Sequence, residues 1–150
     1  MNHLIFKYGL LLYAGFAGLF LVFYFLGLAS VVELRALNGV LHFGILYLLI
    51  RDYRVERPET IDNYVSGVVV GMMASAIGVV AFTVSMLLFL TINNPFFLEL
   101  RAKSPLPDYF TPFTASLYIF VEGIAISLIG AYLIARIVDA RYEGKRGNQH

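Results

Sequence analysis

The chain has 150 residues, of which 59% are hydrophobic and only 14% are charged, and its mean hydropathy is +0.77. A soluble domain of this length cannot bury so much apolar surface in one core, so the composition indicates a membrane protein. The net charge of +1 gives no basic field for a nucleic-acid partner, and the lack of cysteine excludes disulfides, thiolate metal sites and thiol catalysis.

The first apolar segment follows the single cation Lys7 and covers residues 8–29. Its end, Gly27-Leu28-Ala29, loosely fits a small-residue cleavage site, so a signal peptide is one alternative. The apolar region of a signal peptide has roughly 7–15 residues, however, and this segment is longer and rich in aromatic residues. We therefore expect a permanent membrane-spanning helix.

The second apolar segment covers residues 31–50 and is the least regular, because Glu33 and Arg35 lie near its start. A helix needs about 20 residues to cross a bilayer. The segment reaches that length only if these two side chains extend to the headgroup level. The hydrophilic stretch 51–63, which contains Pro58, then predicts a connection outside the membrane.

Two further apolar segments cover residues 64–92 and 113–135. Between them, residues 95–112 contain four prolines and several aromatic residues. This outer loop is expected either as an ordered cap on the membrane surface, where aromatic rings are favoured, or as a flexible connection. The sequence therefore predicts one all-α domain, an integral membrane bundle of four transmembrane helices.

Lysine and arginine are distributed unequally between the two sides of such a bundle. With four spans both termini share a side, and Arg35, Arg101 and Lys103 lie on the other side. The side of the termini carries eight cations: Lys7, Arg51, Arg54, Arg57, Arg136, Arg141, Lys145 and Arg146. By the positive-inside rule, we expect both termini and the middle connection in the cytoplasm.

Small residues form stripes along the third and fourth predicted spans. In lipid, where apolar surfaces gain little by meeting, small residues mark the faces through which helices pack closely. The positions expected to pack are Gly67, Gly71, Ala74, Gly78, Gly123 and Ser127. One alternative is packing of spans within the bundle, and the other is a dimer seam or a ligand groove.

Three polar residues within the predicted spans are candidates for function: Glu122, His42 and Asn38. A carboxylic acid deep in a span pairs, lines water or stays protonated, because an isolated charge there is costly. Asn38 and His42 share a helical face at a depth similar to that of Glu122, so a hydrogen bond from Glu122 to either is expected. The functional alternative is a proton or cation site, and the structural alternative is a hydrogen-bonded acid inside the bundle.

No pattern typical of an enzyme or a metalloprotein follows from the sequence. The three histidines, His3, His42 and His150, do not form a ligand spacing, and no phosphate-binding glycine loop follows a strand. The acidic residues near the loops are expected to be solvated surface: Asp52, Glu56, Glu59 and Asp62. We therefore expect no catalytic residue, no metal and no cofactor.

Short motifs resemble those of a known family. They are Lys7-Tyr8-Gly9, Ile50-Arg51-Asp52-Tyr53-Arg54, and Glu122-Gly123 followed by Ile126-Ser127-Leu128-Ile129-Gly130-Ala131-Tyr132-Leu133-Ile134. This pattern is similar to an uncharacterised four-span membrane family, a domain of unknown function frequent in Bacteroidota, from which the proline-rich outer loop departs. The resemblance implies the fold and a place in the bacterial inner (plasma) membrane, and no mechanism.

Two functional hypotheses follow. The first is a non-enzymatic accessory or assembly subunit that acts by helix packing, with the lipid bilayer and other membrane subunits or a second copy as partners. The alternative is a small transporter or an ion or proton channel that uses Glu122 and His42.

Overall fold

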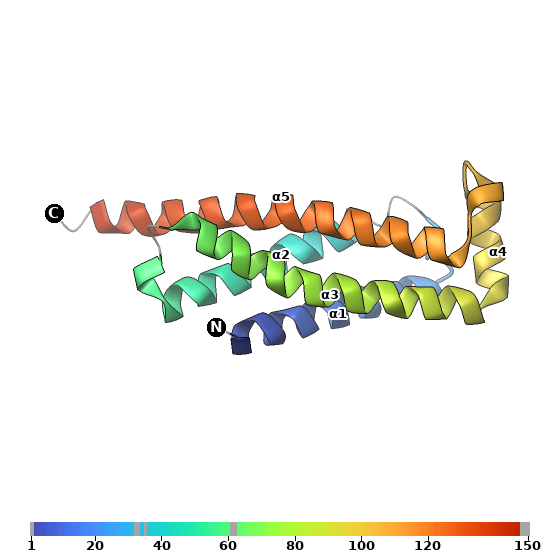
Figure 1. Cartoon of the computed structure of the whole chain (residues 1–150), viewed down its shortest axis with the longest axis horizontal. Coiled ribbons are helices and arrows are strands. Elements are labelled where there is room, and N and C mark those ends of the chain that lie inside the picture. The colour runs from blue at the N-terminus through green and yellow to red at the C-terminus, as the bar shows by residue number, and fades with distance from the viewer. Residues whose placement is uncertain (1, 32–33, 35, 61–62, 148–150) are drawn as a thin grey trace.

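The computed structural model describes the backbone of residues 2–31, 34, 36–60 and 63–147, and the side chains of these residues up to 142. Within these ranges the chain is helical, with no strand. The helices are α1 (Asn2–Phe25), α2 (Ala36–Glu56), α3 (Tyr64–Ile92), α4 (Asn94–Lys103) and α5 (Pro112–Gly147), with short 3₁₀ turns η2 (Pro58–Thr60) and η3 (Pro107–Tyr109). Four helices form an elongated bundle, and α4 lies across one end of it (Figure 1).

Three helices in the described part of the chain are long and apolar enough to cross a membrane: α1, α3 and α5. The helix α2 is shorter and carries charged residues in its last turns, yet it packs alongside the other three. The all-α, membrane-type architecture predicted from the sequence is confirmed. The two chain termini lie at the end of the bundle opposite α4, together with η2 (Figure 1).

The helix α1 ends in a turn that requires glycine. Gly27 has φ of +70°, a conformation in which other residues are strained. Its N–H donates to the carbonyl of Tyr24, and the N–H of Leu28 donates to that of Phe23. This pair of bonds is the Schellman arrangement that closes many helices. Gly27, which fits a signal cleavage site in the sequence, therefore caps the end of α1.

The helix boundaries differ from the predicted segments at several points. The helix α2 begins at Ala36 and continues to Glu56, six residues past the predicted end at residue 50. Glu33 and Arg35, at the start of that segment, lie outside the described residues. The helix α5 continues well past residue 135, to Gly147. The first half of the predicted outer loop belongs to the helix α4, whose first turn is capped by the side chain of Asn93.

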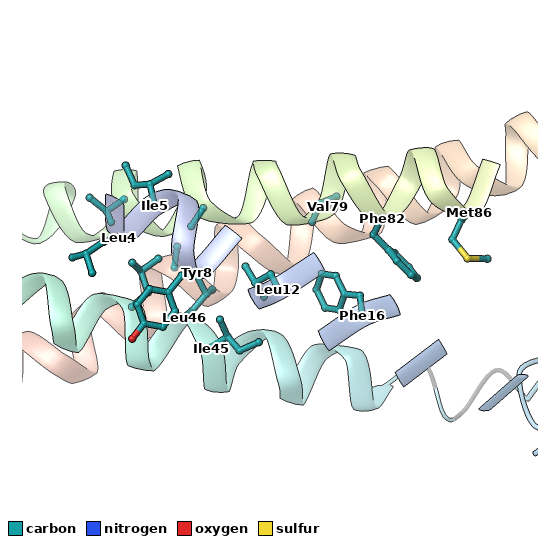
Figure 2. Packing of buried hydrophobic residues seen from close by; sticks show 14 of the residues in the cluster. Leu4, Ile5, Tyr8, Leu12, Phe16, Ile45, Leu46, Val79, Phe82 and Met86 are labelled. Carbon is teal, nitrogen blue, oxygen red and sulfur yellow. The ribbon is translucent and has the colours of Figure 1, made fainter. Parts of the chain in front are cut away.

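The core follows one face of α1. Figure 2 shows Leu12 and Phe16 of α1 lying between α2 and α3. Leu12 is completely buried, as is Leu46 of α2. Phe16 lies 5.6 Å from Phe82 of α3, measured between the ring centroids. Large side chains of α1 therefore fill the centre of the bundle.

The small residues of α3 change their neighbours along the helix. A Cβ built on Gly71 would lie 2.9 Å from the Cβ of Ala131 in α5, and one on Gly67 would lie 3.3 Å from that of Ala135. Further along α3, a Cβ on Gly78 would lie 2.6 Å from the Cβ of Leu12 and 3.1 Å from the carbonyl oxygen of Gly9. The stripe thus faces α5 near the start of α3 and α1 near its middle.

The remaining small residues of the two stripes also lie against neighbouring helices. Ala74 is completely buried, next to the contact between α3 and Gly9 of α1. A Cβ on Gly123 of α5 would lie 2.7 Å from a methyl group of Val79 in α3. Of the two alternatives for the stripes, these contacts support packing within the bundle.

We expect Gly78→Ala to lower the thermal stability of the detergent-solubilised protein, at a cost of about 1–3 kcal/mol, because the added methyl group overlaps α1. Gly18→Ala is the matched control, since no atom lies within 4 Å of a Cβ built at that position in α1. Unfolding midpoints of both variants test this. Equal midpoints for the two variants would contradict close packing at Gly78.

Candidate functional site

A cavity of about 590 Å³ lies at the end of the bundle that carries α4. We attribute it to the length of α2, whose helix begins at Ala36, whereas α1, α3 and α5 continue toward α4 (Figure 1). The space that a longer α2 would fill is thereby left open between the other helices. The volume is within the roughly 300–1,000 Å³ typical of small-molecule sites.

The cavity walls are mainly aromatic and aliphatic. The largest of these side chains are Phe16 and Phe20 of α1, Phe82 and Met86 of α3, and Phe96 of α4. Phe20 and Phe96 meet edge to face with their ring centroids 6.1 Å apart. Such contacts between aromatic edges and faces hold the rings in fixed orientations. The aromatic side chains of the wall are therefore held in place by contacts with one another.

Part of the outer rim of the cavity is polar. Lys103 of α4 lies there, and its ammonium group donates to the hydroxyl of Ser30 at 2.7 Å and to the carboxylate of Glu99 at 2.8 Å. The bond from Lys103 is the main reason that the pKa of Glu99 lies below its usual value. The bond to Ser30 ties α4 to the segment that follows α1, whereas the bond to Glu99 lies within α4. The first of these bonds helps to hold α4 over the cavity.

The inner end of the cavity brings together the three polar candidates from the sequence. Asn38, His42 and Glu122 all line it. His42 is 1% exposed, and its Nε2 lies 2.8 Å from the hydroxyl oxygen of Ser75 in α3. The hydroxyl of Ser127 in α5 lies 3.5 Å from the same nitrogen and donates to the carbonyl of Gly123 at 2.6 Å. The described hydrogen bonds of His42 therefore join it to Ser75 and Ser127. The sequence pattern predicts Glu122 as its partner and does not predict these serines.

The His42–Ser75 pair resembles a nucleophile with its base, but its burial argues against that role. Ser75 and Ser127 are both completely buried. A nucleophile must reach its substrate, and a base must be oriented by a third group. We interpret the pair as a satisfied polar contact that joins α2, α3 and α5.

On the side of His42 away from α4, the bundle is closed. Leu12, Leu46 and Leu49 are completely buried and belong to one apolar cluster. Side chains packed in this way leave no space for a water file. The cavity is therefore open at one end only.

At the opposite end of the bundle, Arg54 of α2 is completely buried. Its guanidinium group makes a bidentate ion pair with Asp139 of α5, with both N–O distances at 2.8 Å. The same group donates to the hydroxyls of Thr60 and Ser66 and to the backbone carbonyls of Thr60 and Asn63. Arg54 thus joins α2, η2, α3 and α5, and all sides of its planar donor fork are occupied.

The sequence pattern does not predict this cluster. It places Arg54 among the cations of a hydrophilic connection and gives no sign of a role for Asp139. A charged residue in the last turns of a membrane helix is ordinarily a headgroup anchor, and its partner is 85 residues away in the chain. The one available signal was the spacing of Ile50, Tyr53 and Arg54, which continues the buried face of α2.

Asp52 is a further correction, because it is not simply solvated surface. It is only partly exposed and accepts a hydrogen bond from the hydroxyl of Tyr8 in α1 and two from Arg51. Glu56 and Glu59 are exposed as expected, and Asp62 lies outside the described residues.

Comparison with known proteins assigns no relative. The chain matches no family model, no curated protein and no solved structure.

We expect Asp139→Asn to destabilise the protein by about 3–5 kcal/mol, because it leaves the buried Arg54 guanidinium without its counter-charge. Arg54→Lys should also be destabilising, since an ammonium group cannot replace the planar donor fork. Thermal unfolding in detergent measures both.

The matched control is Arg51→Gln, which removes an exposed ion pair with Asp52 and should change the unfolding midpoint little. The double variant Arg54→Met/Asp139→Leu should be more stable than either single variant, because no buried charge is left unpaired. A midpoint for Asp139→Asn close to that of Arg51→Gln would contradict a structural role for the buried pair.

Proposed function

We propose that the protein is a four-span protein of the bacterial inner membrane, with both termini in the cytoplasm. The proposal counts α2 as a span, although its charged last turns set it apart from α1, α3 and α5. Two observations support this: α2 packs against α1, α3 and α5, and its one fully buried charge is neutralised by Asp139. A charge neutralised and hydrogen-bonded in this way is tolerated near a membrane.

The proposed orientation rests on the cation distribution. Eight lysines and arginines belong to the end of the termini, against three for the other side of the bundle. One of the eight, Arg54, is buried and does not meet headgroups. The asymmetry remains without it, so the end that carries α4 is expected to face away from the cytoplasm.

Single cysteines test the orientation cleanly, because the chain has none of its own. We expect an impermeant thiol reagent to label Asp108→Cys in intact cells, and to label Glu59→Cys only after the membrane is permeabilised. Both side chains are exposed, so access is limited by the membrane alone. Labelling of Glu59→Cys but not of Asp108→Cys in intact cells would reverse the orientation.

We further propose that the protein acts without catalysis, as an accessory or assembly subunit of a larger membrane complex. The observation that carries this is the closed layer of Leu12, Leu46 and Leu49, which favours a packed scaffold over a conducting path. The outward faces of α1 and α5 carry exposed apolar side chains, such as Val22 and Val121, and these fit lipid or a partner helix.

A small transporter or a proton channel is the second candidate. It is favoured by the cavity, which brings Glu122, His42 and Asn38 together at its inner end. Transport through this site requires the leucine layer to open, because the cavity does not pass through it. A conducting state would therefore differ in the packing of α1 against α2.

Liposomes containing the purified protein separate the two functions. We expect proton and monovalent-cation flux no greater than in empty liposomes, and comigration of other membrane proteins on native gels of mild-detergent extracts. A flux that Glu122→Gln or His42→Gln abolishes, while thermal stability is retained, would replace the accessory role with transport. Leu128→Met, on the exposed face of α5, serves as the control variant.

A further inference from the structure

One buried polar atom at the inner end of the cavity lacks a partner. The side-chain oxygen Oδ1 of Asn38 is inaccessible to solvent and accepts no hydrogen bond within the part of the chain that the structure describes. An acceptor left unpaired in an apolar setting is unfavourable compared with one that meets a donor. Asn38 also lines the cavity, so a rotation of its amide group would turn this oxygen toward a donor held there.

The cavity selects for an apolar molecule with a small polar head. Its long walls are phenyl rings and aliphatic side chains, among them Phe16, Phe82 and Met86. At the border of the cavity, Tyr118 and Leu106 are 65% and 63% exposed. Both present large apolar surfaces there, and we place the entry of a hydrocarbon chain from the bilayer beside them.

The cavity disfavours an anionic head. Lys103, the cation among the described lining residues, is already engaged by Glu99 and Ser30. An anion would therefore enter an apolar cavity without a ready counter-charge, which is costly in a membrane. A hydroxyl or an amide N–H carries the donor that Asn38 lacks without any net charge.

We propose that the cavity binds a neutral single-chain amphiphile, whose hydroxyl or N–H donates to Oδ1 of Asn38 and whose hydrocarbon chain lies against the aromatic wall. A monoacylglycerol and a quinol with an isoprenoid chain share this chemistry. The site is independent of the accessory role, because it uses the interior of the bundle and leaves the outward faces of α1 and α5 free.

A tryptophan reporter tests the site, because the chain contains no tryptophan. Phe96→Trp places the indole in the cavity wall, and Phe25→Trp places it on a surface that is 80% exposed. The protein is held in lipid nanodiscs and titrated with a monoacylglycerol brominated along its chain, which quenches nearby indoles. Phe82→Trp, also in the wall, is the second reporter should Phe96→Trp fail to fold.

Binding in the cavity should give quenching that saturates at a low mole fraction of the probe for Phe96→Trp. Quenching of Phe25→Trp should rise linearly, because that position reports only partition into the bilayer. Linear quenching of Phe96→Trp and Phe82→Trp alike would overturn the proposal.

The role of Asn38 is tested by changing both partners of the hydrogen bond. On the Phe96→Trp background, Asn38→Leu should weaken binding of the brominated monoacylglycerol about tenfold, the effect of one lost hydrogen bond. It should leave unchanged the binding of the matching brominated fatty-acid methyl ester, which has no donor. An equal effect on both probes, or no effect on either, would overturn the assignment of Asn38.

Asn38→Leu also has a readout without ligand. It removes an unpaired buried acceptor, so the empty protein should be at least as stable to heat as the wild type. Unlabelled monoacylglycerol and unlabelled quinol then compete with the bound probe, and the one that displaces it at the lower concentration identifies the source. Failure of both to displace the probe would overturn the proposal.

Discussion

The close approach of backbones along α3 is the constraint on which the rest of the bundle depends. Hydrocarbon tails are as apolar as leucine, so helices in lipid gain stability from near contact of their backbones and from polar contacts. Gly71 meets Ala131 of α5, and Gly78 meets Gly9 and Leu12 of α1. Because α3 holds α5 on one part of its length and α1 on another, it sets the position of both. The aromatic wall and the polar inner end of the cavity follow from those positions.

The two ends of the bundle are stabilised by different chemistry. At the end of the termini, the Arg54–Asp139 pair lies under η2 and is hydrogen-bonded on every side. At the other end, Lys103 holds α4 to Ser30 over a cavity lined by aromatic rings. The first arrangement is buried and fully hydrogen-bonded, and the second leaves a space. The end that carries α4 is therefore where the fold can accept a molecule.

The cavity also changes the interpretation of the intramembrane polar residues. From the sequence alone, a proton path is one interpretation of Glu122, His42 and Asn38. In the fold they line one blind cavity, with His42 bonded to Ser75 and a leucine layer beneath it. Polar groups in that setting position a bound molecule or satisfy one another more readily than they conduct.

The sequence by itself determined the four long apolar segments, because composition and proline or asparagine breaks act within a few residues, but it did not predict the helix α4. It placed the third helix at residues 64–92, where α3 runs from Tyr64 to Ile92, and it identified the small faces of α3 and α5. Only the tertiary structure decided that the glycines of α3 divide between α1 and α5, that Arg54 is buried against Asp139, and that Asn38 lacks a partner. These depend on the rotation and depth of each helix relative to the others. Those quantities are set by contacts between residues far apart in the chain, such as the 85 positions that separate Arg54 from Asp139.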